Sequence, residues 1–378
     1  MRAVEIVGIG WTPVGEHWSA SLAELAHEAV TAAMADAGGA PIEALFVGSA
    51  LCGPLGGQEH LGAHLAERLC LRGVETHRSE ADGASGASAL RLAELAIAGG
   101  AFQRVLVLGI DKTTDLLPDA VDRARAMGLD ADHDAFAGLT VAGAGGLLMS
   151  RYLHEHQHDA AALAPFSVQA HRNALTAAHA YLRREITPQA YARAAPLARP
   201  LSVLDYAPEA DGAAALVLAS AAPGTRGVRI TGSCVAHGPL ALAARPEPLF
   251  FEAAARSVAH ALSLAKRSLP DVSLFELDDA LSIQAALSLE AAGFADRGHA
   301  PVRAAKGAFA LGGDLPICTF GGSKARGNPL GAAGVYRVVE AVLQLRGHAK
   351  ENQVRGAKVA LAQSLGGLGA TAITHVLE

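Results

Sequence analysis

A tight turn of small residues, followed by a helix, decides how this sequence folds. Residues 79–88 read SEADGASGAS, and residues 89–100 continue as ALRLAELAIAGG. The Ala- and Leu-rich run predicts a helix that ends at Gly99 and Gly100, because glycine commonly terminates helices. A short polar run leads into the turn, as in loops that aim a side chain. The residue at the tightest point, however, is Gly83, which has no side chain to aim.

Strand and helix patterns alternate on both sides of this turn. Runs of β-branched and other apolar residues predict buried strands at 3–10, 42–51 and 104–112. A helix is predicted over 21–39, with Ser21 as its N-cap and Glu24 three residues later. This alternation predicts a parallel sheet covered by helices on both faces.

The rest of the chain interrupts this pattern and then repeats it. Residues 112–205 hold short helices, several His and Arg and few long β runs, so we predict an inserted, mostly helical lobe. Residues 210–220 return to a buried strand, and a second round of strands and helices begins near 226. The halves 1–225 and 226–378 therefore predict a duplicated α/β architecture, with a cleft where the strand ends of the two halves meet.

Composition narrows the class of protein. The chain has 378 residues, of which 51% are hydrophobic and 41 are glycine, as in a well-buried globular protein of two domains or two lobes. A formal net charge of −6 argues against a nucleic-acid partner. No apolar run is long enough to span a membrane, and the N-terminus lacks signal-peptide anatomy.

The cysteines and the polar clusters give no metal or disulfide signal. Cys52, Cys70, Cys234 and Cys318 lie far apart with no C-x-x-C pair, which favours a reducing, cytoplasmic setting. Residues 154–159, HEHQHD, are interpreted as a solvated helix rather than a metal site. Residues 130–136, DADHDAF, lack the glycine that a calcium loop needs. No metal is predicted.

Five segments, in order along the chain, resemble thiolases, especially the sterol-carrier-protein-2 type. They are 57–115, 186–220, 275–294, 321–347 and 362–377. The first holds the turn at Gly83, the third resembles the region of the family's His-Asp-x-Phe motif, and the fourth resembles its Gly-His-Pro region. The fifth resembles the C-terminal glycine turn. The resemblance implies an α/β thiolase fold: a duplicated, five-layer αβαβα unit with an inserted helical loop domain and a homodimeric core.

The resemblance also places other residue types at the family's catalytic positions. Gly83 stands at the nucleophilic Cys, Asn328 at the His of Gly-His-Pro, Asp278 at the motif's His or Asn, and Ser364 at the second Cys. A thiolase takes an acyl group onto a cysteine thiolate that a His activates. Without both residues, the chain is predicted to form no acyl-enzyme. Cys52, on a glycine-rich loop that the family places near the cleft, is the one thiol left to consider.

The glycines, the acid pair and the asparagine at the predicted site have functional interpretations, and most of them also have a purely structural one. The N–H groups of Gly83 and Gly366 are expected to form the family's second oxyanion hole. Other glycines either let a thioester approach closely or only serve turns: Gly322, Gly327 and Gly367. Asp278 and Asp279 form either an acid–base pair or a helix N-cap beside a solvated acid. Asn328 either holds a water or carbonyl or is satisfied by its own loop.

Three functions stay open at this stage, and with them whether the chain is an enzyme. The first is a non-thiolytic subunit that binds an acyl-CoA and assembles with an active thiolase or a small zinc-ribbon/OB-fold accessory protein. The second is a non-covalent carbon–carbon lyase, retro-aldol or retro-Claisen, on a β-hydroxy- or β-ketoacyl-CoA, with Asp278 as base and with Ser364 and Asn328 orienting the substrate. The third, acyl-CoA C-acyltransfer, is disfavoured by these residues.

The family resemblance alone implies which ligand the protein binds and in which area of metabolism it acts. Coenzyme A thioester is expected as ligand or substrate, with no covalently bound cofactor, in lipid metabolism. Thiolase-like aldolases tend to use tyrosines in the cleft, but Tyr206 and Tyr336 occupy no motif position.

Overall fold

Nine strands hydrogen-bond into one sheet in the computed structural model, which describes residues 2–221 and 227–378. The first half of the chain supplies five neighbouring strands and the second half four, and the halves join where β1 pairs with β8. In spatial order the strands are β3 (Glu75–Ser79), β2 (Ala44–Gly48), β4 (Arg104–Asp111), β7 (Gly212–Ser220), β1 (Val4–Trp11), β8 (Val228–His237), β11 (Thr371–Leu377), β10 (Ala360–Gly366) and β9 (Leu274–Glu276).

The expectation of a parallel sheet is wrong, because the sheet is mixed. Only the pairs β2–β3, β2–β4 and β9–β10 are parallel. The pairs β4–β7, β1–β7, β1–β8, β8–β11 and β10–β11 are antiparallel. A run of apolar residues shows that a strand is buried, but it carries no information about strand direction. The short glycine turn between β10 and β11 reverses the chain, as only an antiparallel pair allows.

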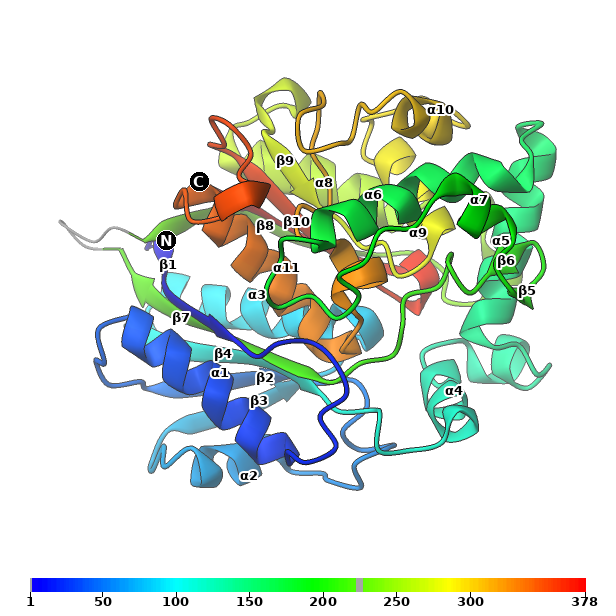
Figure 1. The fold of residues 1–378 in the computed structure, drawn as a ribbon. Helices are drawn as coiled ribbons and strands as arrows, with labels where there is room; N and C mark the ends of the chain where they lie inside the picture. Colours follow the sequence, from blue (N-terminus) through cyan, green and yellow to red (C-terminus); the bar gives the residue numbers. More distant parts are fainter. Residues whose placement is uncertain (1, 222–226) are drawn as a thin grey trace.

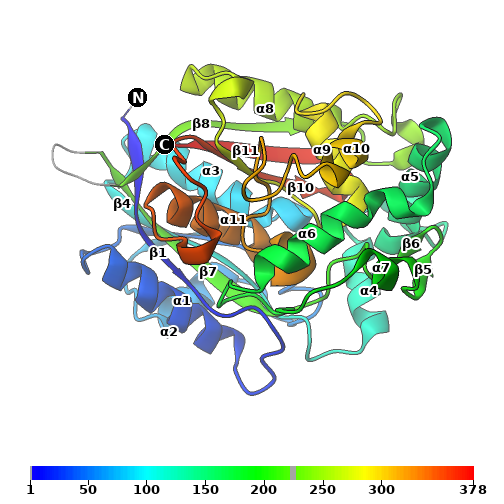
Figure 2. The same cartoon turned by 45° about the horizontal axis from the view of Figure 1, so that its top comes forward.

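Helices cover both outer faces and fill the space between the halves (Figures 1 and 2). On one outer face, α1 (Leu22–Asp36) packs on β1 and β7, and its Ser21–Glu24 capping box is confirmed. On the other, α8 (Glu252–Ala265) packs on β8 and β11. Between them, α3 (Ser85–Ala98) and α11 (Leu330–Leu345) contact strands of both halves. This is the five-layer αβαβα arrangement that the resemblance implied.

The two central helices touch at their first turns. A Cβ on Gly86 of α3 would lie 2.5 Å from the carbonyl oxygen of Gly331 in α11, so only glycine allows this approach. Because α3 begins just after Gly83 and α11 just after Asn328, this contact brings the two candidate positions together.

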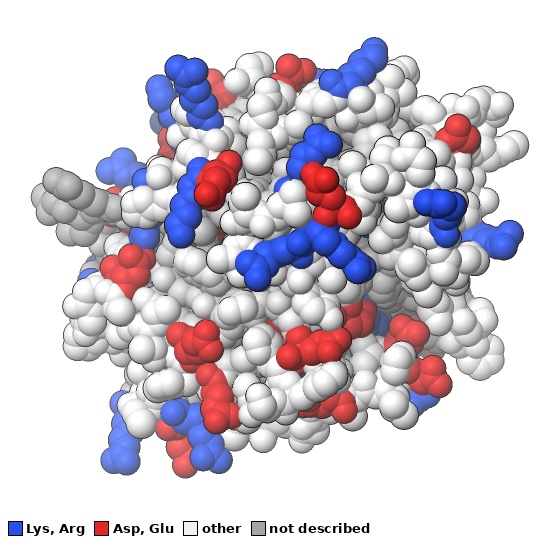
Figure 3. Space-filling model, viewed as in Figure 1, with Lys and Arg blue, Asp and Glu red and all other residues white. Residues whose placement is uncertain are grey.

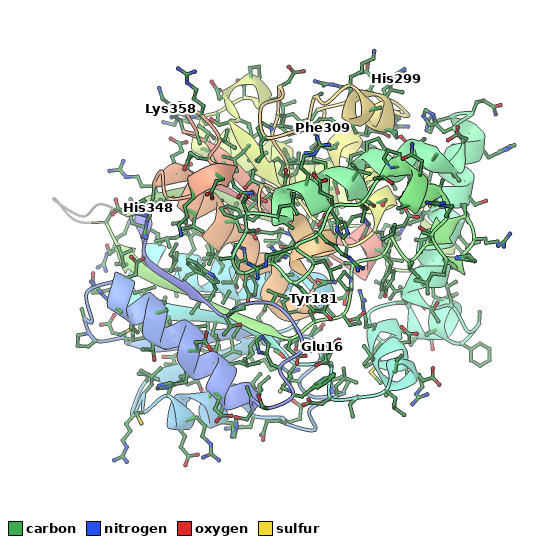
Figure 4. All side chains as sticks on the ribbon, viewed as in Figure 1. Glu16, Tyr181, His299, Phe309, His348 and Lys358 are labelled. Carbon is green, nitrogen blue, oxygen red and sulfur yellow. The ribbon has the colours of Figure 1, made fainter. Side chains whose placement is uncertain are left out.

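The segment between β4 and β7 forms the inserted loop domain. It is mostly helical, with one short hairpin. Its elements are α4 (Pro118–Ala126), α5 (Val141–Glu155), α6 (Ala164–Ala174), α7 (Pro188–Ala192), β5 (Pro196–Ala198) and β6 (Leu201–Ser202). After α6, the hydroxyl of Tyr181 donates a hydrogen bond to Glu16 (2.8 Å). This bond links the loop domain to the segment that follows β1 (Figure 4).

The three α-helices of the described residues that have not yet been given are short. They are α2 (Leu61–Arg68), α9 (Ser282–Ala291) and α10 (Ala300–Ala305). The domain limit expected at 225/226 lies outside the described residues.

Charge is mixed on the face of the molecule that Figure 3 shows. Both kinds of side chain occur there: a small group of Lys and Arg lies near the centre, and most of the acidic side chains in view lie below it. Within the described residues, no helix has both the length and the apolar character needed to cross a bilayer.

Candidate functional site

A small cavity lies beside the starts of α3 and α11. Its volume is about 30 Å³, room for about one water molecule. The turn before α3, the loop after β9, the segment before α11 and the end of β10 line it, with residues of α4 and its flank on the loop-domain side. The lining residues that matter most are Asp82, Gly83, Arg125, Asp278, Asn328 and Leu365. Three sequence-predicted positions, Gly83, Asp278 and Asn328, thus meet in one cavity.

Gly83 leaves no room for a side chain. It is buried in the single 3₁₀ turn Asp82–Ala84 that precedes α3. A Cβ at this position would lie 2.7 Å from the carbonyl oxygen of Leu365, so any side chain requires the end of β10 to shift.

All four cysteines lie in the described part of the chain, and none lines this cavity. Cys52 lines a separate open pocket of about 1000 Å³ beside α1 and α2. Its thiol donates to the carbonyl oxygen of Gln58 (3.4 Å), and burial raises its pKa to about 11. Cys318 is fully enclosed, which raises its pKa far above the ordinary value. Cys52 therefore does not lie in the cavity beside Gly83.

Asp278 faces the cavity, but its carboxylate already has protein partners. Its Oδ1 accepts the N–H of Ala280 (3.1 Å) and its Oδ2 accepts the N–H of Leu365 (3.2 Å). Oδ2 also lies 2.9 Å from Nη2 of the buried Arg337. Arg337 in turn donates from Nη1 to the hydroxyl of Ser364 (3.0 Å).

Asp279 points away from the cavity, into the segment before α11. Its Oδ1 accepts the N–H of Ser323 (2.6 Å). Burial raises its pKa, while Lys324 and Arg337 oppose that change. The interpretation of this pair as an N-cap beside a solvated acid is wrong, because both side chains are buried and Leu281 is the N-cap of α9.

Asn328 presents an unpaired donor at the cavity. Its backbone N–H donates to the carbonyl oxygen of Pro208 (3.1 Å), but among the described residues its buried side-chain Nδ2 has no hydrogen-bond partner. The interpretation that its own loop satisfies the side chain is therefore wrong. A buried unpaired donor costs about 1–3 kcal/mol, so this amide calls for a water or a ligand oxygen.

The other sequence-predicted residues do not line the cavity. Ser364 turns toward Arg337 and α11. Gly322 has φ +54° and lies against the Asp279 carboxylate, and Gly327 has φ +99°. Positive φ favours glycine at both positions, and at Gly322 a Cβ would also lie 2.3 Å from Oδ2 of Asp279.

The glycine turn after β10 lies next to the cavity, because Leu365 and Leu368 on either side of it line the cavity. Gly366 packs against the carbonyl oxygen of Ala81, which a Cβ at 366 would approach to 2.3 Å. The N–H of Gly367 donates to Oδ2 of Asp82 (2.9 Å), so this donor is already used within the chain.

Sequence reasoning missed the loop-domain wall of the cavity and the acid beside Gly83. Arg125 of α4 pairs with Glu209 and lies over the ring of Tyr206, 5.0 Å from its centroid. These residues lie up to 84 positions apart and belong to no motif, so no sequence signal unites them. Asp82 had a signal, because it directly precedes Gly83, which is predicted to stand at the family's nucleophile position. Tyr336 does not line the cavity, and its hydroxyl donates a hydrogen bond to the carbonyl oxygen of Thr12 (2.9 Å).

Comparison with known families decides the assignment. Residues 4–196 match the model "Thiolase, N-terminal domain", and residues 234–378 match "Thiolase C-terminal domain-like". The chain belongs to the thiolase family. Positions 83 and 328, where the sequence predicts that catalytic residues are replaced, therefore lie within a thiolase fold.

Relatives cover the thiolase chain from end to end. An acetyl-CoA acetyltransferase of Methanothermobacter thermautotrophicus is 33% identical over 100% of both chains. Human sterol carrier protein 2 is 27% identical over 99% of this chain and 72% of its own length, as the resemblance implied. Among solved structures, the Ltp2-ChsH2(DUF35) aldolase superimposes with a TM-score of 0.86 at 24% identity, over 99% of this chain and 97% of that one. This last likeness establishes the fold.

Proposed function

We propose that this thiolase-family chain binds an acyl-CoA thioester without forming a covalent acyl-enzyme, as a non-thiolytic subunit. The observation that carries the proposal is the vacant position 83, in a cavity that no cysteine lines. The methanogen relative is named for acetyl-CoA, which supports a coenzyme A thioester as the ligand class.

The free Nδ2 donor of Asn328 supports binding of the thioester carbonyl oxygen. A neutral hydrogen bond of this kind contributes about 0.5–1.5 kcal/mol. A thioester needs more room than the present 30 Å³, so the proposed binding requires the cavity to widen.

Two measurements test this function together. Acid-quenched protein that has been incubated with labelled acetyl-CoA should show no acyl adduct by mass spectrometry. Calorimetry should show acetyl-CoA binding that weakens about 2- to 10-fold in Asn328→Ala. Gln189→Ala, an exposed change on α7, is the matched control and should bind as the wild type does. A stable adduct at any residue, or no binding at all, would refute the proposal.

A non-covalent carbon–carbon lyase is the second candidate, and a specific observation favours it. Two carboxylates, Asp82 and Asp278, line the same cavity as the free amide of Asn328, which places acids beside a donor for an enolate oxygen. The superimposed aldolase supports this candidate at the level of the fold alone. Ser364, which faces Arg337 and not the cavity, would act only through that arginine. Acyl-CoA C-acyltransfer is the third candidate, and adduct trapping decides it.

The partners belong to the same proposal. We propose a homodimer, a cytoplasmic location and an accessory protein, either an active thiolase or a zinc-ribbon/OB-fold chain. The name of the superimposed Ltp2-ChsH2(DUF35) aldolase joins that protein to a DUF35 chain, which supports an accessory protein for this one. Co-purification of the chain from its native host tests this, since isolation of the chain alone would remove the accessory protein from the proposal.

A further inference from the structure

Asp82 directly precedes the vacant position, and its backbone is unusual. Its φ is +50°, a left-handed conformation that few residues other than glycine adopt. Its backbone N–H donates to the Glu80 carboxylate (2.6 Å). This conformation turns the Asp82 side chain toward the glycine turn, where its Oδ2 accepts the N–H of Gly367 (2.9 Å). Non-glycine residues in this region are often found where a site needs a side chain held in one direction.

The Asp82 carboxylate is enclosed by the protein, and the residue lines the cavity. Gly128 packs against it so closely that a Cβ there would lie 2.8 Å from Asp82 Cγ. Burial raises its pKa, and the Gly367 N–H and the charge of Arg125 oppose this rise.

Asp278, the other acid of the cavity, is less suited to carry a proton. Both its oxygens accept backbone N–H groups, and Oδ2 also pairs with Arg337. Protonation would break this buried ion pair. The Asp82 carboxyl also receives backbone N–H groups, those of Gly367 and Gly83, but among the described residues it forms no ion pair like that of Asp278 with Arg337. The role of base that the sequence suggested for Asp278 therefore fits Asp82 better.

We propose that Asp82 exchanges a proton with the α-carbon of the bound acyl thioester. In this step the α C–H bond breaks, its electron pair forms the C=C bond of the enolate, and the carbonyl π pair moves to the oxygen, which accepts from Asn328 Nδ2. The proton passes to the Asp82 carboxylate. The reverse step returns a solvent-exchanged proton to the carbon. In the lyase candidate, the same return protonates the enolate left after C–C cleavage.

This inference rests on the proposed thioester binding, and the test separates the two. Acetyl-CoA is incubated with the protein in D₂O, and deuterium incorporation into its methyl group is followed by NMR. The wild type should accelerate exchange, and Asp82→Asn should slow it by about 100-fold, within the usual range for a positioned base. The asparagine oxygen still accepts the Gly367 N–H, so the turn keeps its contact.

Three further measurements fix the interpretation. Calorimetric binding of acetyl-CoA should be retained in Asp82→Asn, and its melting temperature should confirm folding. Asp119→Asn, an exposed change on α4, should exchange like the wild type. Exchange by Asp82→Asn within twofold of the wild type, or binding without exchange in the wild type, overturns the role of Asp82 alone. Absence of binding in the wild type overturns the proposed function and this inference with it.

Discussion

Gly83 has no side chain, and the folded structure leaves no space for one at this position. The family resemblance identified Gly83 as the vacant position from residue order alone. It could not reveal the Leu365 carbonyl oxygen 2.7 Å from the place of a Cβ, because that contact joins residues 282 positions apart. Sequence likewise marked Asn328 as a substituted position, whereas its unpaired Nδ2 is a property of the folded cavity.

Restoring the thiol should therefore not restore the chemistry. Gly83→Cys should destabilise the protein by about 1–3 kcal/mol, because the new Cβ overpacks the end of β10. It should also fail to form an acetyl adduct, since Asn328 cannot activate a thiol as a base does. Denaturant unfolding and adduct trapping measure the two effects. Gly312→Cys, where a Cβ meets open space, should leave stability nearly unchanged. Efficient acetylation of Gly83→Cys would contradict this explanation.

The turn before α11 is buried although it carries two basic residues, Lys324 and Arg326. Gly322–Arg326 forms a single π-helical turn, and it is fully buried. Its Lys324 donates from Nζ to the carbonyl oxygen of Asp205 (2.5 Å), across from the Asp279 carboxylate that favours its charge. In the sequence, this segment belongs to the region 321–347 that resembles the family's Gly-His-Pro region, and nothing there indicates that Lys324 is buried. A buried lysine becomes visible only when the loop domain covers it.

Lys324 should make stability depend on alkaline pH. Burial lowers its pKa from 10.5 to about 8, so between these values the unfolded chain holds a proton that the folded chain lacks. The unfolding free energy of the wild type relative to Lys324→Met should therefore rise from pH 8 toward pH 10.5, by up to roughly 3 kcal/mol. Lys358→Met, at the surface in Figure 4, should show no such difference. A difference that falls or stays level with pH would disprove the lowered pKa.

At the scale of the whole molecule, the sequence predicted the order of elements and the duplicated layers, but not how the halves join. The resemblance supplied the αβαβα arrangement, while strand direction, such as the antiparallel pairing of β1 with β8, had no local signal. The cavity depends on the same long-range assembly. Its walls meet because α3 and α11 touch through Gly86 and Gly331, and because α4 closes over them.

This assembly leaves one edge and one apolar face uncovered. β3 pairs only with β2, so its other side carries unpaired backbone groups. The hydroxyl of Ser79, at the end of β3, donates to Ser88 of α3 (2.7 Å), and the same helix exposes Leu92 and Leu95 to 44% and 42%. We propose this open strand edge, next to the exposed leucines, as the surface on which the second copy of the proposed homodimer would pair.

Replacing these leucines should therefore separate the proposed homodimer. Light scattering coupled to size exclusion should give twice the 38.5 kDa chain mass for the wild type. Leu92→Glu/Leu95→Glu should shift it to one chain mass, because buried carboxylates oppose association. Leu264→Glu, at 49% exposure on α8, is the control and should remain dimeric. A folded double variant that stays dimeric would move the interface away from α3 and β3, and a monomeric wild type would remove the homodimer from the proposal.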